Sequence, residues 1–227
     1  MPSLTQLLTS HDRLLVLDAA SMTVQAGLWR TGQSERWCNC REEAGSGIFT
    51  NTKSLLDEAG LRISDIGAFV FCEGPGSMLG TRTIAMALRT WQVLAPRPVY
   101  AYQSLAVAGQ YLWTQSSPRA FTVVADARRD TWHCQPVAVD GHLPPLQRRP
   151  ASTLPDGDLV MPENFRTWAA LPRPARTCSY DLARIFPVVA DRDIFHRVEL
   201  PDAFQPDAPA YRKWSAQIHS TLTADKK

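Results

Sequence analysis

The residues best placed to do chemistry form the segment 74–82, Gly-Pro-Gly-Ser-Met-Leu-Gly-Thr-Arg, which follows an apolar run ending at Cys72. Glycines let a backbone turn sharply and approach a ligand closely. We expect a helix to start after Ser77, and the free amide groups of a helix N-terminus suit a phosphate. The segment has neither the Walker pattern nor the Gly-x-Gly-x-x-Gly fingerprint, and Glu73 adds an acid that disfavours phosphate. A plain tight turn therefore stays open as the alternative.

Two aspartates, Asp18 and Asp126, each end an apolar run and each precede an alanine. A carboxylate at a strand end can hold a magnesium ion or a water near phosphate. It can equally cap a turn, which for Asp18 would be at Ser21 or Met22. The repeated Asp-Ala step indicates either an internal duplication or a coincidence. Arg82, one turn into the expected helix, would meet a carboxylate or a phosphate, or lie in solvent.

Other catalytic templates are missing from the sequence. The five histidines form no paired helical motif, and Cys38 and Cys40 are the one close pair among five scattered cysteines, so a zinc site lacks its ligands. No nucleophile elbow is present. An odd number of scattered cysteines fits reduced thiols in the cytoplasm. We therefore expect no metal and no catalytic residue.

Composition narrows the classes further. The chain has 227 residues, a formal net charge of +2 and 44% hydrophobic residues, which is enough to build a core. This balance gives no general attraction to nucleic acid or to anionic membranes, although a local basic patch stays open. No apolar stretch approaches the length of a membrane span, and the first residues do not resemble a signal peptide. We expect a cytoplasmic protein without a membrane partner.

The first half of the chain predicts a mixed sheet with helices. An antiparallel meander of three strands is followed by strands that alternate with helices, and strands joined by helices run parallel. The expected strands are Leu14–Leu17, Thr23–Trp29, Ser34–Cys40, Ala68–Cys72 and Val99–Tyr102. The expected helices are Ile48–Ala59, a helix capped by Ser77 that runs to Leu94, and Ser104–Trp113.

The second half predicts less regular structure. Strands are expected at Phe121–Ala125 and Thr131–Val139, and an irregular, proline-rich stretch from Leu143 to Pro174. Within and beyond that stretch we expect short helices at Glu163–Ala170 and Ser179–Ile185, an extended segment Pro201–Pro209 and a terminal helix Trp214–Leu222.

These residues resemble a known family. The segment around the glycine turn resembles the Gly-Pro-Gly-Ser-Phe-Thr-Gly-Leu-Arg motif of the TsaB (YeaZ) family, accessory subunits of bacterial tRNA threonylcarbamoyladenosine synthesis. Asp18-Ala19-Ala20, Asp126-Ala127-Arg128 and Pro209–Arg212 resemble further family segments, with Met78-Leu79 as a departure in the long motif. The matched motif positions are Gly74, Pro75, Gly76, Ser77, Gly80 and Arg82.

The resemblance implies an α/β fold of the actin-like, Hsp70-like ATPase (ASKHA) class, with two ribonuclease-H-like lobes on mixed β-sheets. We place the N-terminal lobe at residues 1–103 and a shortened C-terminal lobe at 104–227. In this division the terminal helix is a candidate to pack back on the first lobe. Asp18, Asp126, Arg128 and the glycine turn are the positions that would lie near a nucleotide.

The resemblance also implies a non-catalytic scaffold that binds and supports the TsaD transferase in t6A modification of tRNA at position 37, with TsaE and, functionally, TsaC. No histidine stands in the helix at 48–59, so a TsaD-type metal site lacks its ligands. We expect no cofactor of its own and only indirect contact with tRNA. ATP or ADP at the complex interface and a homodimer stay open. The alternative is a degenerate ASKHA-fold phosphotransferase or a glycoprotease-like (peptidase M22-like) enzyme.

The family pairs through the first two helices of its N-terminal lobe, here 48–59 and 77–94. The second helix has more apolar surface than one core-facing stripe needs, and a second buried face would explain it. A helix sandwiched inside its own lobe is the alternative. The expected partner contacts are Ile48, Leu55, Leu56, Met78, Leu79, Arg82, Ile84, Met86 and Trp91.

Overall fold

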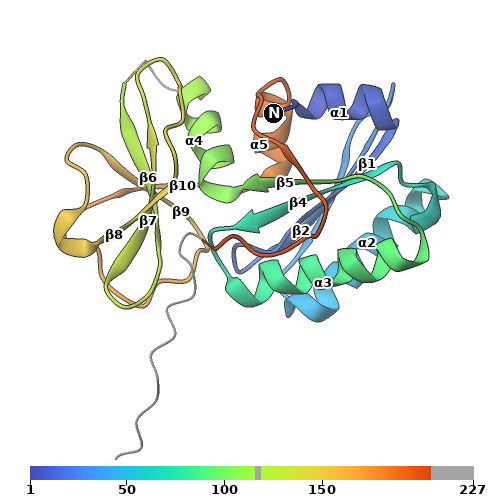
Figure 1. Cartoon of the computed structure of the whole chain (residues 1–227), viewed down its shortest axis with the longest axis horizontal. Coiled ribbons are helices and arrows are strands. Elements are labelled where there is room, and N and C mark those ends of the chain that lie inside the picture. Colours follow the sequence, from blue (N-terminus) through green and yellow to red (C-terminus); the bar gives the residue numbers. More distant parts are fainter. Residues whose placement is uncertain (116–118, 206–227) are drawn as a thin grey trace, which may run out of the picture.

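The chain forms two lobes, each built on one mixed β-sheet (Figure 1). This computed structural model describes residues 1–115 and 119–205. The six-stranded sheet of the first lobe has the order β11-β5-β4-β1-β2-β3, and the five-stranded sheet of the second has the order β10-β9-β6-β7-β8. No helix within the described ranges has the length and hydropathy that a membrane crossing needs.

The elements of the first half are α1 (Leu4–His11), β1 (Arg13–Asp18), β2 (Val24–Arg30), β3 (Arg36–Cys40), α2 (Ala44–Ala59), η1 (Ile63–Asp65), β4 (Ala68–Gly74), α3 (Met78–Leu94), β5 (Val99–Gln103) and α4 (Ser104–Gln115). Those of the second half are β6 (Phe121–Asp126), β7 (Thr131–Val137), β8 (Gln147–Pro150), η2 (Ala151–Thr153), β9 (Leu159–Pro162), β10 (Arg176–Cys178), α5 (Leu182–Val189) and β11 (His196–Val198).

The first sheet has the predicted mixed pairing, because β1 is antiparallel to β2 and parallel to β4, and β4 is parallel to β5. Its two faces are both covered. Leu15 and Leu17 of β1 point toward α2 and α3, whereas Leu14 and Val16 belong to the core on the side of α1, α4 and α5. Burial on both faces explains why this strand is a continuous apolar run rather than an alternating one.

The second sheet repeats the strand order of the first. A meander of β6, β7 and β8 is followed by β9, parallel to β6, and β10, parallel to β9. Asp18 and Asp126 end the first strand of their sheets, and the Oδ1 atom of each accepts a hydrogen bond from the N–H two residues on, at 2.8 Å and 2.6 Å. The shared topology and the shared turn favour the internal duplication over coincidence.

The second lobe has fewer helices than the first. Between β8 and β9 lies only the short η2, and the described segment between β9 and β10 has no helix. The short helix predicted at 163–170 is therefore wrong, because the N–H groups of Trp168 and Ala169 donate to the Asp126 carboxylate instead of to helical carbonyls. The stretch predicted to be irregular also contains β8 and β9, which are short.

Several boundaries differ from the prediction. α2 begins at Ala44 rather than at Ile48, and its first turns include Gly47, which packs closely on Cys40 of β3, where an added Cβ would lie 2.8 Å from the sulfur. α5 begins at Leu182 behind Asp181, whose side chain caps Ala183 N–H. Helix α1 was not predicted, although its capping box of Ser3 and Gln6 is visible in the sequence. The predicted terminal helix Trp214–Leu222 and the segment Pro209–Arg212 lie outside the described residues.

The chain returns from the second lobe to the first. Strand β11 adds to the edge of the first sheet beside β5. Arg89 of α3 then donates to the Pro201 carbonyl at 2.6 Å, and Phe204 N–H donates to the Glu73 carbonyl at 2.7 Å. The first sheet thus includes residues that follow position 103.

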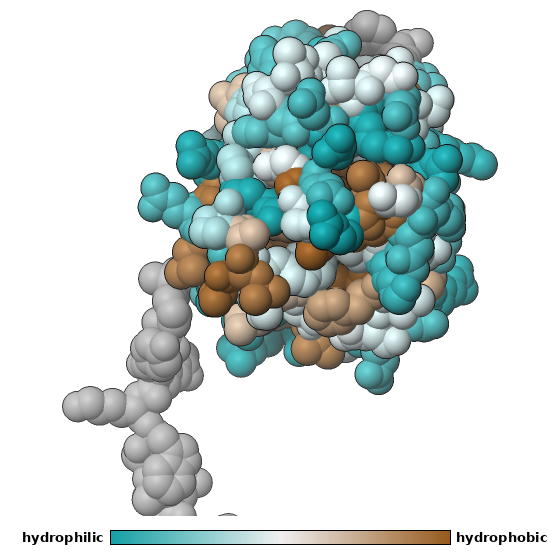
Figure 2. Space-filling model, turned by 90° about the vertical axis from the view of Figure 1, so that its right-hand side faces the viewer, coloured by the Kyte–Doolittle hydropathy of each residue, from teal (hydrophilic) through white to brown (hydrophobic). Residues whose placement is uncertain are grey.

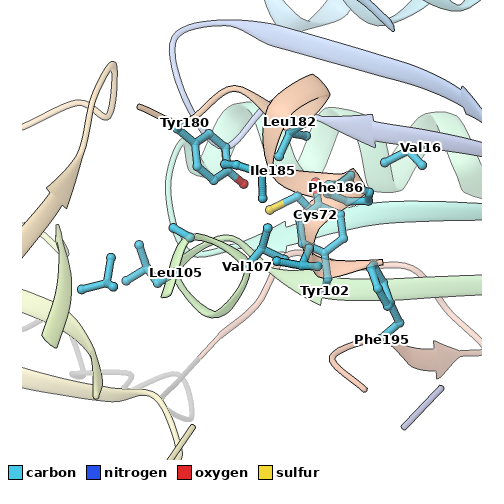
Figure 3. Close-up of a cluster of buried hydrophobic side chains, with 14 of the residues drawn as sticks. Val16, Cys72, Tyr102, Leu105, Val107, Tyr180, Leu182, Ile185, Phe186 and Phe195 are labelled. Carbon is cyan, nitrogen blue, oxygen red and sulfur yellow. The ribbon is translucent and has the colours of Figure 1, made fainter. Parts of the chain in front are cut away.

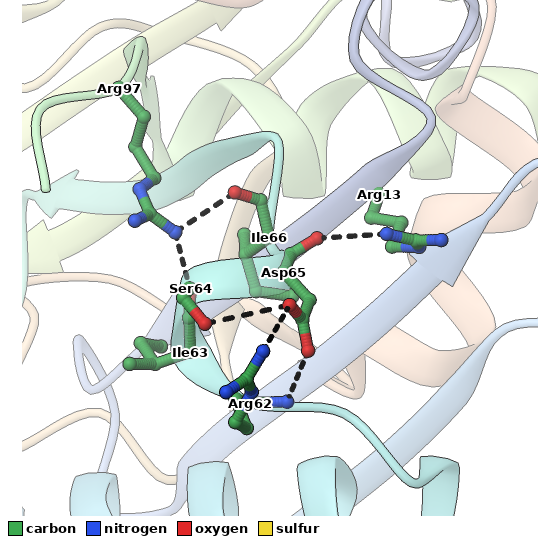
Figure 4. Close-up of polar contacts among 7 residues, drawn as sticks. All are labelled: Arg13, Arg62, Ile63, Ser64, Asp65, Ile66 and Arg97. Carbon is green, nitrogen blue, oxygen red and sulfur yellow. Dashed lines mark hydrogen bonds and ion pairs between the residues drawn. The ribbon is translucent and has the colours of Figure 1, made fainter.

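A polar cluster fastens the turn between α2 and β4 (Figure 4). The Arg97 guanidinium, in the loop after α3, donates to the carbonyls of Ile63 and Ile66, the latter at 2.9 Å. The same guanidinium lies 5.3 Å from the Phe69 ring centroid. Asp65 closes the turn by accepting from Arg62 N–H at 2.8 Å. Arg97 therefore ties two connections on one edge of the lobe to each other.

Replacement of Arg97 by leucine is expected to lower the free energy of unfolding by about 1–3 kcal/mol, because the carbonyl groups of Ala95, Ile63 and Ile66 lose their donor. Urea unfolding followed by circular dichroism measures this loss. Arg62→Leu is the matched control, since its side chain is 84% exposed and exposed substitutions change stability by less than about 0.5 kcal/mol. Equal losses in the two variants would contradict the assignment.

Candidate functional site at the glycine turn and helix α3

The glycine turn joins β4 to α3 and packs against the connection between β1 and β2. Ser77 caps α3 as predicted, with its hydroxyl accepting from Gly80 N–H at 3.3 Å, and its own N–H donates to the Ala20 carbonyl at 2.7 Å. A Cβ added to Gly76 would lie 2.3 Å from the Ala20 oxygen, and one added to Gly80 would lie 2.1 Å from the Ala19 oxygen. The space made by these glycines is thus filled by the protein's own backbone.

Gly74 and Pro75 complete the turn with a cis peptide bond. The Pro75 carbonyl accepts a hydrogen bond of 2.5 Å from the hydroxyl of Ser104, the first residue of α4. Gly74 has φ +117°, a conformation that favours glycine. The turn therefore connects β4, α3 and α4, which is the structural alternative that the sequence left open.

Asp18 lies fully buried at the end of β1, beside this turn. Its Oδ2 atom accepts hydrogen bonds of 2.7 Å from the hydroxyls of Tyr102 and Tyr180, and its Oδ1 atom accepts from Ala20 N–H. Asp18 thus caps the turn through Ala20 N–H, and the predicted capping of Ser21 or Met22 is wrong. Figure 3 shows the Tyr180 hydroxyl pointing toward Cys72 inside the buried cluster. Burial raises the pKa of the Asp18 carboxyl, and the hydrogen bonds from Tyr102, Ala20 and Tyr180 offset only part of that rise.

These contacts do not fit a nucleotide-bound magnesium ion at Asp18. A magnesium ligand needs a carboxylate oxygen facing water or phosphate, whereas the Asp18 oxygens are occupied by protein donors. Glu73, next to the turn, contacts His196 at 3.3 Å and accepts from Gln103 at 3.2 Å. Within residues 1–115 and 119–205, no three His, Cys, Asp or Glu side chains form a group that would hold a metal ion.

Asp126, the equivalent residue of the second lobe, anchors two loops. Its Oδ1 atom accepts from Arg128 N–H, and its Oδ2 atom accepts from the N–H groups of Trp168 and Ala169 at 2.7 Å and 2.9 Å. The Arg128 guanidinium lies 4.3 Å from the Trp168 ring centroid. Asp126 thus positions the loop after β6 and the segment at 168–169, as Asp18 positions the loop after β1.

The expected partner contacts divide into buried and exposed residues. Four of them face the core between the two helices and the first sheet and cannot contact a partner, which corrects the prediction for Ile48, Leu55, Leu56 and Ile84. Trp91 is half-buried and packs between the rings of Phe69 and Phe49. Four residues are exposed as expected, namely Met78, Leu79, Arg82 and Met86.

The exposed residues of α3 form one stripe. Leu79, Arg82, Met86 and Val93 follow the spacing of a helix face opposite Ile84, and Val93 is 85% exposed. Phe49, Val93 and Leu94 are exposed as well and were not among the predicted contacts, although the helical spacing from Leu79 through Met86 points to Val93. We define the α3 face as Phe49, Leu79, Arg82, Met86, Val93 and Leu94. Figure 2 shows hydrophobic surface gathered in its lower half, at the height of α2 and α3.

Proteins of known structure share the fold of this chain. No protein-family model matches the chain. YeaZ from Pseudomonas aeruginosa has a similar structure, with a TM-score of 0.61 and 20% identity over 78% of this chain and 90% of that protein. A further structure, described as similar to the peptidase YEAZ from Pseudomonas aeruginosa, has a TM-score of 0.58 and 20% identity over 74% of this chain and 84% of its own. Likeness at this identity shows the fold.

The strand order of both sheets and the YeaZ match define the chain as a two-lobed α/β protein with the predicted actin-like fold of ribonuclease-H-like lobes. By sequence, it is similar to the tRNA threonylcarbamoyladenosine biosynthesis protein TsaB of Escherichia coli, with 25% identity over 117 residues. The predicted resemblance to the TsaB (YeaZ) family is thereby confirmed. The chain spans about half the length of this curated relative, since the match covers 51% of each.

Proposed function

We propose that this protein is a partner-binding subunit in the t6A modification of tRNA and that it presents the α3 face to a TsaD-type transferase. The observation that carries the proposal is the two-sided packing of α3. Ile84 and Leu88 of this helix are fully buried in the first lobe, whereas Leu79 and Met86 on the opposite side are 77% and 56% exposed. Contiguous exposed apolar side chains on a soluble domain mark an interaction surface.

The shape of the surface supports this role. Phe49 of α2 touches Trp91 of α3 edge to face at 5.9 Å and is itself 50% exposed, so both helices carry exposed apolar side chains. Arg82 stands within the stripe, and Lys53 and Asp57 of α2, about one and two turns after Phe49, are exposed. An apolar centre with charged residues at its edge is the usual composition of a protein interface.

The site chemistry also supports a role without catalysis. The Asp18 carboxylate is occupied by three protein donors, and the glycine turn is filled by the backbone of residues 19 and 20. We propose that the TsaD partner performs the transfer and that TsaE and the TsaC product act through the assembled complex. ATP or ADP would then bind at the complex interface, and tRNA would reach this chain through the complex.

The same face can also pair two copies of this chain. An isologous homodimer buries the same patch on both subunits. The homodimer would then compete with the TsaD complex for the α3 face. The fraction of this chain that is bound to TsaD would therefore depend on the total concentration of the chain.

The mixing experiment combines the purified chain with TsaD from the same organism and measures the mass of the eluting species by size-exclusion chromatography with light scattering. We expect a one-to-one complex that Met86→Asp weakens on the order of 100-fold, or about 2.7 kcal/mol, because a charge would be buried in the apolar centre. Repeating the titration with ATP and with ADP tests whether a nucleotide strengthens it.

Val139→Asp is the matched control, because Val139 is 55% exposed on the second lobe, away from the α3 face. It should bind TsaD like the unchanged protein. If the two unmodified proteins elute separately at micromolar concentration, or if Met86→Asp binds as well as Val139→Asp, the proposed function is wrong.

A further inference from the structure

The loop between β6 and β7 is strained and held in place. Arg128, Arg129 and Asp130 have φ values of +64°, +52° and +55°, which non-glycine residues seldom adopt. The loop keeps this shape because Thr131 N–H and its hydroxyl both donate to the Arg128 carbonyl, at 3.0 Å and 2.7 Å. Strain that the surrounding structure maintains is common at binding sites. Here the strained loop carries two exposed arginines, Arg128 and Arg129.

Arg128 and Trp168 form a preorganised flat surface. The guanidinium lies 4.3 Å from the indole centroid, and Trp168 is 52% exposed. Asp126, buried between them, accepts hydrogen bonds from the backbone N–H groups of both residues. Their orientation is therefore set by the protein before any ligand arrives, which lowers the cost of binding.

A narrow groove runs from this pair toward the N-terminal end of α3, which faces the second lobe (Figure 1). It consists of two hollows of about 120 Å³ and 110 Å³ that share Gly76, Met78, Ala127 and His133. Arg128, Arg166 and the Asp126 carboxylate, which accepts from backbone N–H groups, line the first hollow. Glu73 and Arg148 line the second, where the Arg148 guanidinium donates to the Thr131 hydroxyl and the Ala127 carbonyl. Among the described residues, no carboxylate lies within salt-bridge distance of Arg128, Arg129 or Arg166.

We propose that this groove binds single-stranded RNA, with a base stacked beside the Arg128–Trp168 pair and the adjacent phosphates on Arg129 and Arg166. Single-stranded nucleic acid is bound by a cationic groove that follows the backbone and by aromatic rings that stack bases. Each hollow is much smaller than the pocket of about 300–1000 Å³ that encloses a small ligand, so an open track for a polynucleotide fits better than a site for a free nucleotide.

RNA binding in this groove deepens the proposed function. It rests on that function only for the identity of the RNA, which would be a tRNA loop. It also changes one expectation, since this chain would contact RNA directly rather than only through its partner. The net charge of +2 does not conflict with it, because the attraction comes from a local set of arginines on the second lobe.

The test is fluorescence anisotropy of a 5′-labelled twelve-nucleotide single-stranded RNA titrated with the full chain alone, at several salt concentrations. If two phosphates are contacted, log affinity should fall with log salt with a slope of about −1.4. Trp168→Ala should weaken binding on the order of 10-fold with little change in slope, because it removes stacking. Arg129→Gln should weaken binding and make the slope shallower by about 0.7.

Arg62→Gln, in the first lobe, is the matched control and should bind RNA like the unchanged chain. Absence of RNA binding, or equal binding by Trp168→Ala and Arg62→Gln, overturns the proposal. So does complete displacement of the RNA by an equimolar amount of ATP, which would identify a mononucleotide site. Met86→Asp should keep RNA binding while losing TsaD, so failure of this inference is distinguishable from failure of the proposed function.

Discussion

Gly80→Ala is expected to lower the free energy of unfolding by about 2 kcal/mol and to weaken binding through the α3 face. The new Cβ would lie 2.1 Å from the Ala19 carbonyl oxygen and 3.0 Å from the Ala19 Cβ. These are backbone and near-backbone atoms, so α3 or the connection between β1 and β2 must move. Overpacking of this kind costs about 1–3 kcal/mol or more, which exceeds the gain of about 1 kcal/mol from replacing a helical glycine.

Gly45→Ala provides the control for this prediction. Gly45 is also helical, in the first turn of α2, but nothing lies within 4 Å of an added Cβ. It should leave stability unchanged or raise it by up to about 1 kcal/mol. Urea unfolding of both variants measures the difference, and the mixing experiment with TsaD reports the position of α3. A stabilised Gly80→Ala variant would show that the glycine is not required for packing.

Asp18→Ala is expected to cost about 3 kcal/mol or more of folding free energy. The hydroxyls of Tyr102 and Tyr180 and the N–H of Ala20 would lose their acceptor in a buried site, and each unsatisfied buried group costs about 1–3 kcal/mol. Asp18→Asn is the matched variant, because it keeps the shape and an oxygen acceptor. It should be far closer in stability to the unchanged protein. Equal losses in the two variants would contradict this role of the carboxylate.

The Asp18 cluster also predicts a direction of pH dependence. Burial raises the pKa of Asp18 in the folded protein above its unfolded value of about 3.9. The folded state therefore binds the proton more tightly, so this contribution to stability is fully present below the unfolded pKa and is lost as the pH rises through the folded pKa. Subtracting the stability of Asp18→Asn from that of the unchanged protein at each pH isolates this contribution. The difference should fall with rising pH, and a flat difference would contradict it.

The contacts of Gly80 and Asp18 together explain how the segment 74–82 packs. Gly76 and Gly80 are small because the chain of residues 19 and 20 passes against them. Asp18 fixes that passing chain through Ala20 and ties it to Tyr180, which precedes α5. The segment 74–82 thus sets where α3 begins and how it lies, and the position of α3 determines which side chains face a partner.

Much of the first lobe was predictable from local pattern. Strands such as Leu14–Leu17 are continuous apolar runs, and the helix that follows Ser77 begins with a capping residue. In the second lobe, β9 and β10 have four and three residues, which is too short for a periodic pattern. The segment 163–170 was predicted as a helix because local sequence does not show that Asp126 would take its N–H groups.

The strand and helix order of the first lobe, the cap of α3 and the positions of Asp18 and Asp126 can be predicted from local sequence, because they depend on neighbours along the chain. Local sequence does not show that Ile84 faces inward and Met86 outward, since both lie on one apolar helix and the sheet beneath selects the buried side. The Asp18–Tyr180 hydrogen bond joins residues 162 positions apart, and a contact of that range follows from the closed fold, not from spacing.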